Sequence, residues 1–174
     1  MARFIIIALI AQSVLAQGTQ SGFPYTQIHS ISESYSITYL PDVDNQGMID
    51  EDLDRLSPAP YRYGYIHHID ISSDNSGRWT DTADGGRLWQ IAFTSGGAYS
   101  LSVEYEDFYI PLGGELYVYS PNYSVVYGAY THHNNTEHQY FSTPHVKGDT
   151  VVIEYYEPLG ADDSFSLQIA DVIH

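Results

Sequence analysis

Residues 132–138 (HHNNTEH) hold the densest group of side chains that could bind a metal ion, with His132, His133 and His138. Imidazole nitrogens are ligands for zinc, copper and nickel. Neighbouring histidines on a loop usually point apart, so we expect no physiological metal site here. His67 and His68 are expected in a strand, where adjacent rings face opposite sides of the sheet.

Residues 42–47 (DVDNQG) begin like an EF-hand loop, with acids at the first and third positions and Gly at the sixth. The twelfth position is Leu53 instead of the bidentate Glu that such a loop requires. Loose surface binding of Ca²⁺ stays open as an alternative. Residues 81–85 (DTADG) are more simply a turn.

Catalytic motifs are missing from the sequence. There is no G-x-S-x-G, and the Ser, His and Asp residues follow no recognisable catalytic spacing. Glu104 and Glu106 would share one face of a strand, which indicates a solvated surface and not a glycosidase pair. We therefore predict a non-catalytic protein, with no catalytic, cofactor-binding or metal-binding residues.

Two N-glycosylation sequons begin at Asn122 (NYS) and Asn134 (NNT). Both fall between strand-like runs, in loops, where acceptor asparagines belong. They matter only if the host glycosylates its secreted proteins, which the sequence leaves open.

Strands must position most of these side chains, because period-two alternation dominates from residue 65 onward. One apolar face per strand requires a second sheet to cover it. The predicted fold class is an all-β, jelly-roll-like antiparallel β-sandwich of eight or nine strands. The expected strands are residues 65–71, 87–94, 98–105, 115–120, 125–130, 138–143, 150–157 and 164–173. The residues expected to share inward faces are Trp89, Ile91 and Phe93; Tyr99, Leu101, Val103 and Tyr105; Val151, Ile153 and Tyr155; and Phe165, Leu167 and Ile169.

The first 64 residues have a different character. Residues 1–16 are predicted to be a signal peptide, with Arg3, a short apolar run and an expected cleavage site after Ala16. Residues 17–64 are a polar, mostly irregular segment, with a weak strand pattern at 34–40 and one short helix at 48–56. Pro58 and Pro60 end that helix. Residues 65–174 are the sandwich domain.

The composition restricts the partners. Acidic residues number 22 against 6 basic ones, for a net charge of −16, so nucleic acid is excluded. The lack of cysteine excludes disulfides and zinc–thiolate sites. No segment after the leader reaches about 20 apolar residues, so we expect no membrane span. The 17 tyrosines suit half-buried strands, with the ring packed and the hydroxyl in water.

Several blocks between residues 40 and 174 resemble the N-terminal pro-region of secreted bacterial lysyl-endopeptidase-like serine proteases. The resemblance implies a β-rich domain that precedes a trypsin-like catalytic domain. None of the family's catalytic motifs is present, and the sequence ends at His174, about where the protease would begin, so no catalytic residue is carried over. The blocks are residues 62–64 (RYG), 86–91 (GRLWQI), 97–102 (GAYSLS), 108–121 (FYIPLGGELYVYSP), 128–131 (GAYT), 142–144 (STP), 146–149 (VKGD), 152–155 (VIEY) and 169–174 (IADVIH).

Three functions follow from these observations. The leading one is a secreted pro-domain or accessory domain that folds, masks or anchors an extracellular serine protease, with a protease domain or another extracellular protein as its partner. The tyrosines, the acidic surface and the edge strands favour a stand-alone structural or adhesive protein that self-associates into a matrix or filament. Exposed tyrosine rings would suit a carbohydrate-binding module.

Overall fold

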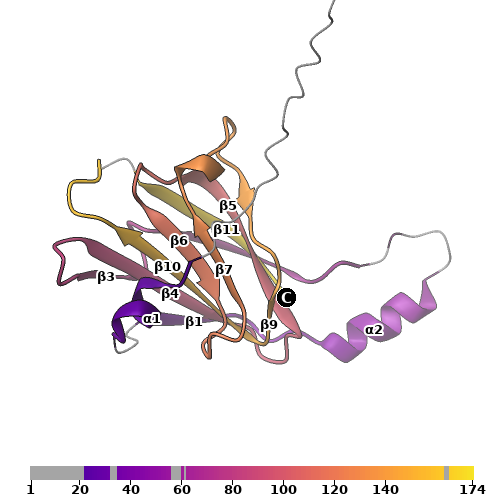
Figure 1. The fold of residues 1–174 in the computed structure, drawn as a ribbon. Coiled ribbons are helices and arrows are strands. Elements are labelled where there is room, and N and C mark those ends of the chain that lie inside the picture. The colour runs from indigo at the N-terminus through magenta and orange to yellow at the C-terminus, as the bar shows by residue number, and fades with distance from the viewer. Residues whose placement is uncertain (1–21, 32–34, 56–59, 61, 163–164) are drawn as a thin grey trace, which may run out of the picture.

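Two β-sheets packed face to face make up the body of the protein (Figure 1). The computed structural model describes residues 22–31, 35–55, 60, 62–162 and 165–174. Within these residues, eleven strands and two α-helices are present. The all-β sandwich predicted from the sequence is confirmed. The strand number exceeds eight or nine because the short strands β3 (Arg78–Asp81) and β9 (Val146–Lys147) were not expected, and the strand expected at 138–143 is reduced to β8 (Phe141–Ser142).

The larger sheet has the order β1-β4-β10-β6-β7, with β3 also paired to β4, and the smaller one has the order β2-β11-β5-β8, with β9 also paired to β5. The larger sheet contains β1 (Ser36–Tyr39), β3 (Arg78–Asp81), β4 (Arg87–Thr94), β6 (Glu115–Tyr119), β7 (Val126–Tyr130) and β10 (Thr150–Glu157). The smaller contains β2 (Ile66–Ser72), β5 (Ser100–Tyr109), β8 (Phe141–Ser142), β9 (Val146–Lys147) and β11 (Ser166–Ile173).

The core lies between the sheets, where the alternation predicted it. In the register of β4 and β10, Trp89 is opposite Tyr155 and Ile91 is opposite Ile153, and all four are fully buried. Tyr99 is an exception to the predicted faces, because β5 begins at Ser100 and Tyr99 stays 79% exposed.

Several tyrosines are buried more deeply than expected, because their hydroxyl groups do not face water. Tyr105, Tyr119 and Tyr155 are almost fully buried, rings and hydroxyls together. Burial raises the pKa of all three well above 10, which keeps them neutral at any physiological pH. Tyr155 stacks on Phe165 with ring centroids 3.6 Å apart. Tyrosine therefore serves this core as a large aromatic filler.

The N-terminal segment is more structured than predicted. It contains α1 (Tyr25–His29), β1 and α2 (Asn45–Asp54), and β1 pairs in parallel with β4. The larger sheet therefore includes residues from before position 65. The helix expected at 48–56 begins earlier, because the Asp44 side chain caps it by accepting a hydrogen bond from Gly47 N at 2.9 Å. The signal peptide and its cleavage site at Ala16 lie outside the described residues.

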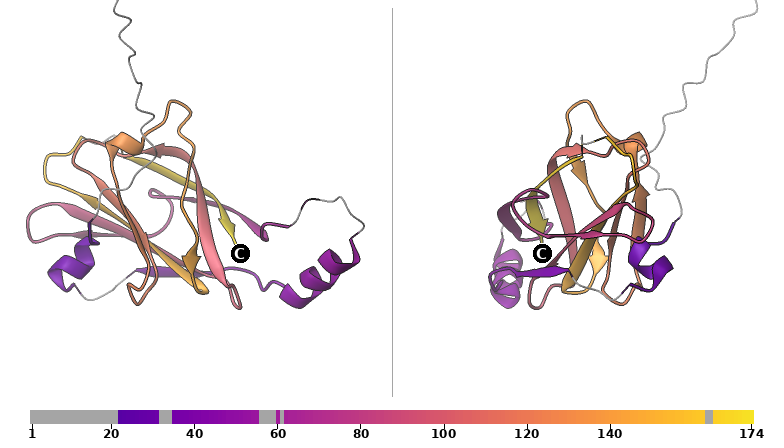
Figure 2. Two further views of the ribbon diagram at one scale, coloured as in Figure 1. Left: turned by 45° about the vertical axis from the view of Figure 1, so that its right-hand side comes forward. Right: turned by 90° about the vertical axis from the view of Figure 1, so that its left-hand side faces the viewer.

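The two helices occupy different sides of the sandwich. Figure 2 shows α1 against a face of the larger sheet, whereas α2 projects from the opposite side, near the last described residues. Neither of these two helices is long and apolar enough to cross a membrane.

Candidate functional site

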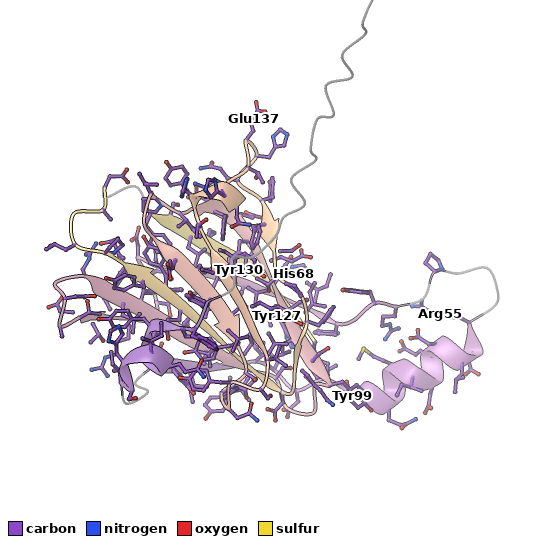
Figure 3. All side chains as sticks on the ribbon, in the orientation of Figure 1. Arg55, His68, Tyr99, Tyr127, Tyr130 and Glu137 are labelled. Carbon is purple, nitrogen blue, oxygen red and sulfur yellow. The ribbon has the colours of Figure 1, made fainter. Side chains whose placement is uncertain are left out.

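A groove of about 210 Å³ lies between α2 and the sandwich. One wall comes from α2 and the other from the residues that precede β2, the start of β5 and the turn before β9. In Figure 3, Tyr99 lies close to the base of α2 and Arg55 lies toward its far end. The Tyr63 hydroxyl and His145 Nε2 are hydrogen-bonded partners at this groove. Its apolar and aromatic lining consists of Met48, Ile49, Tyr63, Tyr99, His145 and His174.

A chain of four polar side chains runs from the sandwich core to the start of α2. His67 Nε2 lies 3.2 Å from Ser95 Oγ, and Ser95 Oγ lies 2.6 Å from His174 Nδ1. His174 Nε2 lies 2.7 Å from Asn45 Oδ1, while Asn45 Nδ2 donates to the Gly97 carbonyl. Because Asn45 Oδ1 can only accept, His174 Nε2 donates, and Ser95 in turn donates to His174 Nδ1 and accepts from His67.

The surroundings of both histidines in this chain favour the neutral ring. Burial, together with the nearby ring of His174, lowers the pKa of His67. Burial likewise lowers the pKa of His174. A protonated His174 would carry N–H groups on both ring nitrogens and could no longer accept from Ser95. The chain of hydrogen bonds is therefore complete only when the His174 ring is neutral.

Ser95, His174 and Asn45 have the residue types of a nucleophile, a base and an orienting group. Ser95 is nevertheless fully buried, so no substrate can reach its hydroxyl. In the serine protease arrangement the base meets the nucleophile through Nε2 and the orienting group through Nδ1, which is the reverse of the order here. These hydrogen bonds therefore have a structural role, in which they connect the start of α2 to the residue that follows β11.

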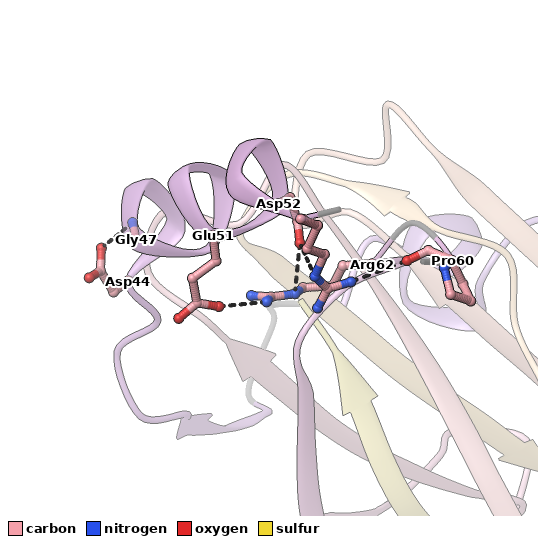
Figure 4. Close-up of polar contacts among 7 residues, drawn as sticks. Asp44, Gly47, Glu51, Asp52, Pro60 and Arg62 are labelled. Atoms are coloured by element: carbon pink, nitrogen blue, oxygen red, sulfur yellow. Dashed lines mark hydrogen bonds and ion pairs between the residues drawn. The ribbon is translucent and has the colours of Figure 1, made fainter. Parts of the chain in front are cut away.

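Helix α2 carries an exposed surface of mixed apolar and acidic character. No residue of Asn45–Asp54 is buried, and Ile49 and Leu53 are 43% and 78% exposed. Arg62 approaches the helix from the next segment and forms ion pairs with Glu51 at 2.6 Å and Asp52 at 3.6 Å (Figure 4). The bond to Glu51 raises the pKa of Arg62. Contacts at its ends and sides hold α2 in place, with little apolar packing.

Helix α1 is anchored in a different way, on the outer face of the larger sheet. Its anchor is Glu154 of β10, a fully buried carboxylate. The Glu154 oxygens accept hydrogen bonds from Thr26 N at 3.1 Å and Thr26 Oγ1 at 2.6 Å. They also accept from Gln90 Nε2 at 3.0 Å and from the Tyr119 hydroxyl at 2.8 Å. Four donors thus compensate the burial of one carboxylate.

The histidine groups considered from the sequence are placed as follows. His132 and His133 lie in a short 3₁₀ helix with ring centroids 3.9 Å apart, so these two neighbours do not point apart as expected. His67 is buried and His68 is exposed and paired with Asp171, in line with alternation along β2. Among the residues that the structure describes, no three His, Asp or Glu side chains gather closely enough to hold a metal ion.

The acidic candidates are explained by local structure. Asp44 and Gly47, which resembled the start of a calcium loop, form the N-cap of α2. Glu104 and Glu106 are both exposed along β5, as expected for a solvated face. The turn expected at residues 81–85 is present at 82–85, since Asp81 is the last residue of β3. Hydrogen bonds from the hydroxyls of Thr82 and Tyr156 lower the pKa of Asp84 to about 2.

The two sequon asparagines differ in accessibility. Asn122 is exposed in the turn between β6 and β7, and its Oδ1 accepts from Ser120 Oγ and Ser124 N. Asn134 is buried, and its Oδ1 accepts from Thr131 N at 2.9 Å. Asn122 therefore offers the more accessible amide, and glycosylation at either residue stays a prediction.

Residues 68–174 match the family model of the lysyl endopeptidase N-terminal domain. The chain belongs to this family. The resemblance drawn from the sequence blocks is thereby confirmed. No solved structure matches the chain. The match to the family model begins in β2, so α1, β1 and α2 lie outside the matched region. The groove is therefore lined on one side by matched residues such as Tyr99 and His174, and on the other by residues of α2 that the family model does not cover.

Sequence reasoning did not find Asn45, Ser95, His174 or the anchor of α1. The first three are ordinary polar residues far apart in the sequence, and no local pattern links them. Glu154 did leave a signal, because it is the single charged residue within an otherwise apolar and aromatic run, residues 151–156 (VVIEYY). A charge in the middle of a buried strand requires compensating donors.

Proposed function

We propose that this domain is the secreted, non-catalytic pro-domain of a serine protease that acts at lysyl bonds, and that it binds the catalytic domain of that protease. The observation that carries the proposal is the match to the lysyl endopeptidase N-terminal domain over residues 68–174. The burial of Ser95 supports a non-catalytic role, because the serine with the most suggestive hydrogen bonds is closed to substrate.

The surface best suited to the protease is α2 with the adjoining groove. It presents Ile49, which lines the groove together with Tyr63 and Tyr99, and exposed Leu53 one turn further along α2. Apolar and aromatic side chains of this kind are typical of the centre of an interface. Asp50, Glu51 and Asp54 surround this apolar strip along the helix. The complementary partner is thus a catalytic-domain face with apolar side chains at its centre and basic side chains around it.

Binding and inhibition by purified domain test this proposal. We expect the domain to inhibit lysyl endopeptidase activity, and to bind a catalytic domain whose nucleophile is replaced, as measured by calorimetry. The double variant Ile49→Gln/Leu53→Gln should weaken binding about ten-fold or more, as expected for apolar anchors. Absence of binding by the unmodified domain at micromolar concentration would overturn the pro-domain proposal.

A matched control separates the surface from general effects. Leu159 is 77% exposed, close to the 78% of Leu53, and it lies in the β10–β11 connection, at the other end of the molecule from α2 (Figure 1). Leu159→Gln should leave the affinity unchanged. Equal losses in both variants would show that α2 is not the docking surface.

Self-association is a second candidate, and strand β1 is the observation that favours it. β1 lies at an edge of the larger sheet, and its Ile37 and Tyr39 are exposed. Edge strands of this kind can pair with another copy. Size-exclusion chromatography at two concentrations tests it, because a strict monomer at both excludes a matrix or filament subunit.

A further inference from the structure

Lysine is nearly excluded from this chain. The sequence contains a single lysine, Lys147, against five arginines. The basic residues beside α2, Arg55 and Arg62, are both arginine. In a domain that accompanies a protease acting at lysyl bonds, lysine is the residue that exposes the chain to that protease, and arginine is not.

The one lysine has an accessible side chain on a fixed backbone. Lys147 is exposed and ends β9, where it pairs with Ser100 of β5. On the other side of its peptide bond, Gly148 N donates to the Tyr99 carbonyl at 2.9 Å. One residue further along the chain, the carbonyl of Asp149 accepts from Ser95 N at 2.9 Å.

These backbone hydrogen bonds protect the peptide bond between Lys147 and Gly148. A protease that takes its substrate by strand addition pairs with an extended segment whose backbone groups are free. Here the N–H of Gly148, which belongs to the bond itself, is already paired with the residue before β5, and the carbonyl of Asp149 is paired with the residue after β4. The side chain can be recognised in the folded domain, but the backbone cannot be bound.

A cut at this bond would remove the central strands of both sheets. β10 lies between β4 and β6 in the larger sheet, and β11 lies between β2 and β5 in the smaller one. Both strands follow Lys147. Hydrolysis adds one water across the C–N bond, leaving a carboxylate on Lys147 and a free amine on Gly148. The N-terminal fragment, which ends at Lys147, contains neither β10 nor β11.

We propose that the bond between Lys147 and Gly148 is a cleavage site that opens only when the domain unfolds. A lysine-specific endopeptidase spares the folded domain and dismantles the unfolded one with a single cut. The biological protease is taken from the proposed function, but the site itself is a property of this chain. Inhibition while folded, followed by irreversible removal once unfolded, would make release of the protease a one-way step.

Proteolysis by a lysine-specific endopeptidase at increasing urea concentrations below the unfolding midpoint tests the proposal. Intact mass should show only two products, one ending at Lys147 and one beginning at Gly148. Ile169→Val removes a methylene from the core, far along the chain from the cut, and should speed cleavage roughly five-fold by raising the unfolded population. The products should lose the β-sheet circular dichroism signal.

Two variants serve as controls. Lys147→Arg should resist the protease at every urea concentration. Arg55→Lys places a lysine at the end of α2, which has no buried residue, and should be cut at once in native buffer, with no further acceleration by Ile169→Val. Cleavage of the unmodified domain as fast as Arg55→Lys, an unchanged rate in Ile169→Val, or products that keep their sheet signal would each overturn the proposal.

These results are independent of the proposed function. Failure of the domain to bind a catalytic domain would remove the biological protease but leave the cleavage rates as they are. Failure of the cleavage experiment would leave binding and inhibition unaffected.

Discussion

Helices α1 and α2 come from the same polar segment of the chain, yet the shorter one is the more deeply anchored. α1 has five residues and buries Tyr25 and Thr26. α2 has ten residues and buries none. Length and helical pattern therefore do not decide which helix packs, because the stability of a helix in a protein comes mostly from tertiary contacts.

The difference lies in what each helix meets on the sandwich. α1 meets the outer face of β10, where Tyr156 stacks on Tyr25 with centroids 4.5 Å apart and Glu154 requires hydrogen-bond donors. α2 extends away from the sandwich and is fastened through Asn45 at its first residue and by Arg62 alongside it. A buried polar anchor fixes α1, while α2 keeps its apolar strip available.

Removal of the anchor should have the largest effect on stability. Glu154→Ala leaves the donors on Thr26, Gln90 and Tyr119 without their shared acceptor. We expect a loss of about 3–5 kcal/mol in the free energy of unfolding, measured by urea denaturation. Glu104→Ala, on the exposed face of β5, is the control and should change stability by less than about 0.5 kcal/mol. A loss below about 1 kcal/mol in Glu154→Ala would show that α1 does not depend on this carboxylate.

Loss of a single hydrogen-bond donor to Glu154 should lower the free energy of unfolding less than loss of Glu154 itself. Thr26→Val keeps the shape of the side chain and the backbone N–H but removes the hydroxyl that lies 2.6 Å from Glu154. We expect about 1–2 kcal/mol of destabilisation. Its exposed neighbour in α1 provides the control Gln27→Ala, with a change within about 0.5 kcal/mol. In the Glu154→Ala background Thr26→Val should have almost no further effect, and additive losses would contradict a direct coupling.

The strands could be predicted from the sequence where both neighbours of a strand are strands of the same sheet. Both β4 and β10 begin and end at the residues that the alternation indicated. Short strands such as β3 and β9 were missed, because two to four residues carry too little periodicity. The parallel pairing of β1 with β4 is a long-range contact that alternation cannot encode.

The hydrogen-bonded side chains beneath the groove, which link His67 to Asn45, could not be predicted from the sequence for the same reason. Asn45 and His174 are 129 positions apart, and Ser95 and His174 are 79 apart. Their types gave no reason to bring them together. The family, in contrast, could be named from sequence blocks, because turns and buried strands leave local patterns that survive without knowledge of the contacts.

The hydrogen bonds that hold α2 should make a smaller contribution to stability than Glu154 does for α1, and this contribution should depend on pH. Burial lowers the pKa of His67 and His174 below the 6.5 of the unfolded chain. As the pH falls through 6.5, the unfolded chain takes up protons that the folded protein resists, so stability decreases. Asp84 acts in a separate window, because its folded pKa of about 2 lies below its usual 3.8, and its contribution is lost only as the pH falls from about 4 toward 2.

Unfolding midpoints between pH 8 and pH 5 measure the histidine effect. His67→Gln keeps a donor toward Ser95 but removes one titrating ring, and should make the midpoint less dependent on pH in this range. An unchanged dependence would mean that His67 is not part of the titrating chain.

The smallest effect should come from the apolar strip of α2. Leu53→Gln replaces a side chain that is 78% exposed, so the free energy of unfolding should change by less than about 0.5 kcal/mol in urea denaturation. Tyr25→Ala, the buried counterpart in α1, should cost about 3 kcal/mol. A loss above about 1 kcal/mol in Leu53→Gln would mean that α2 packs on its own domain in solution. The strip would then contribute to folding and would be closed to a catalytic domain, so a neutral result here is a requirement for docking through α2.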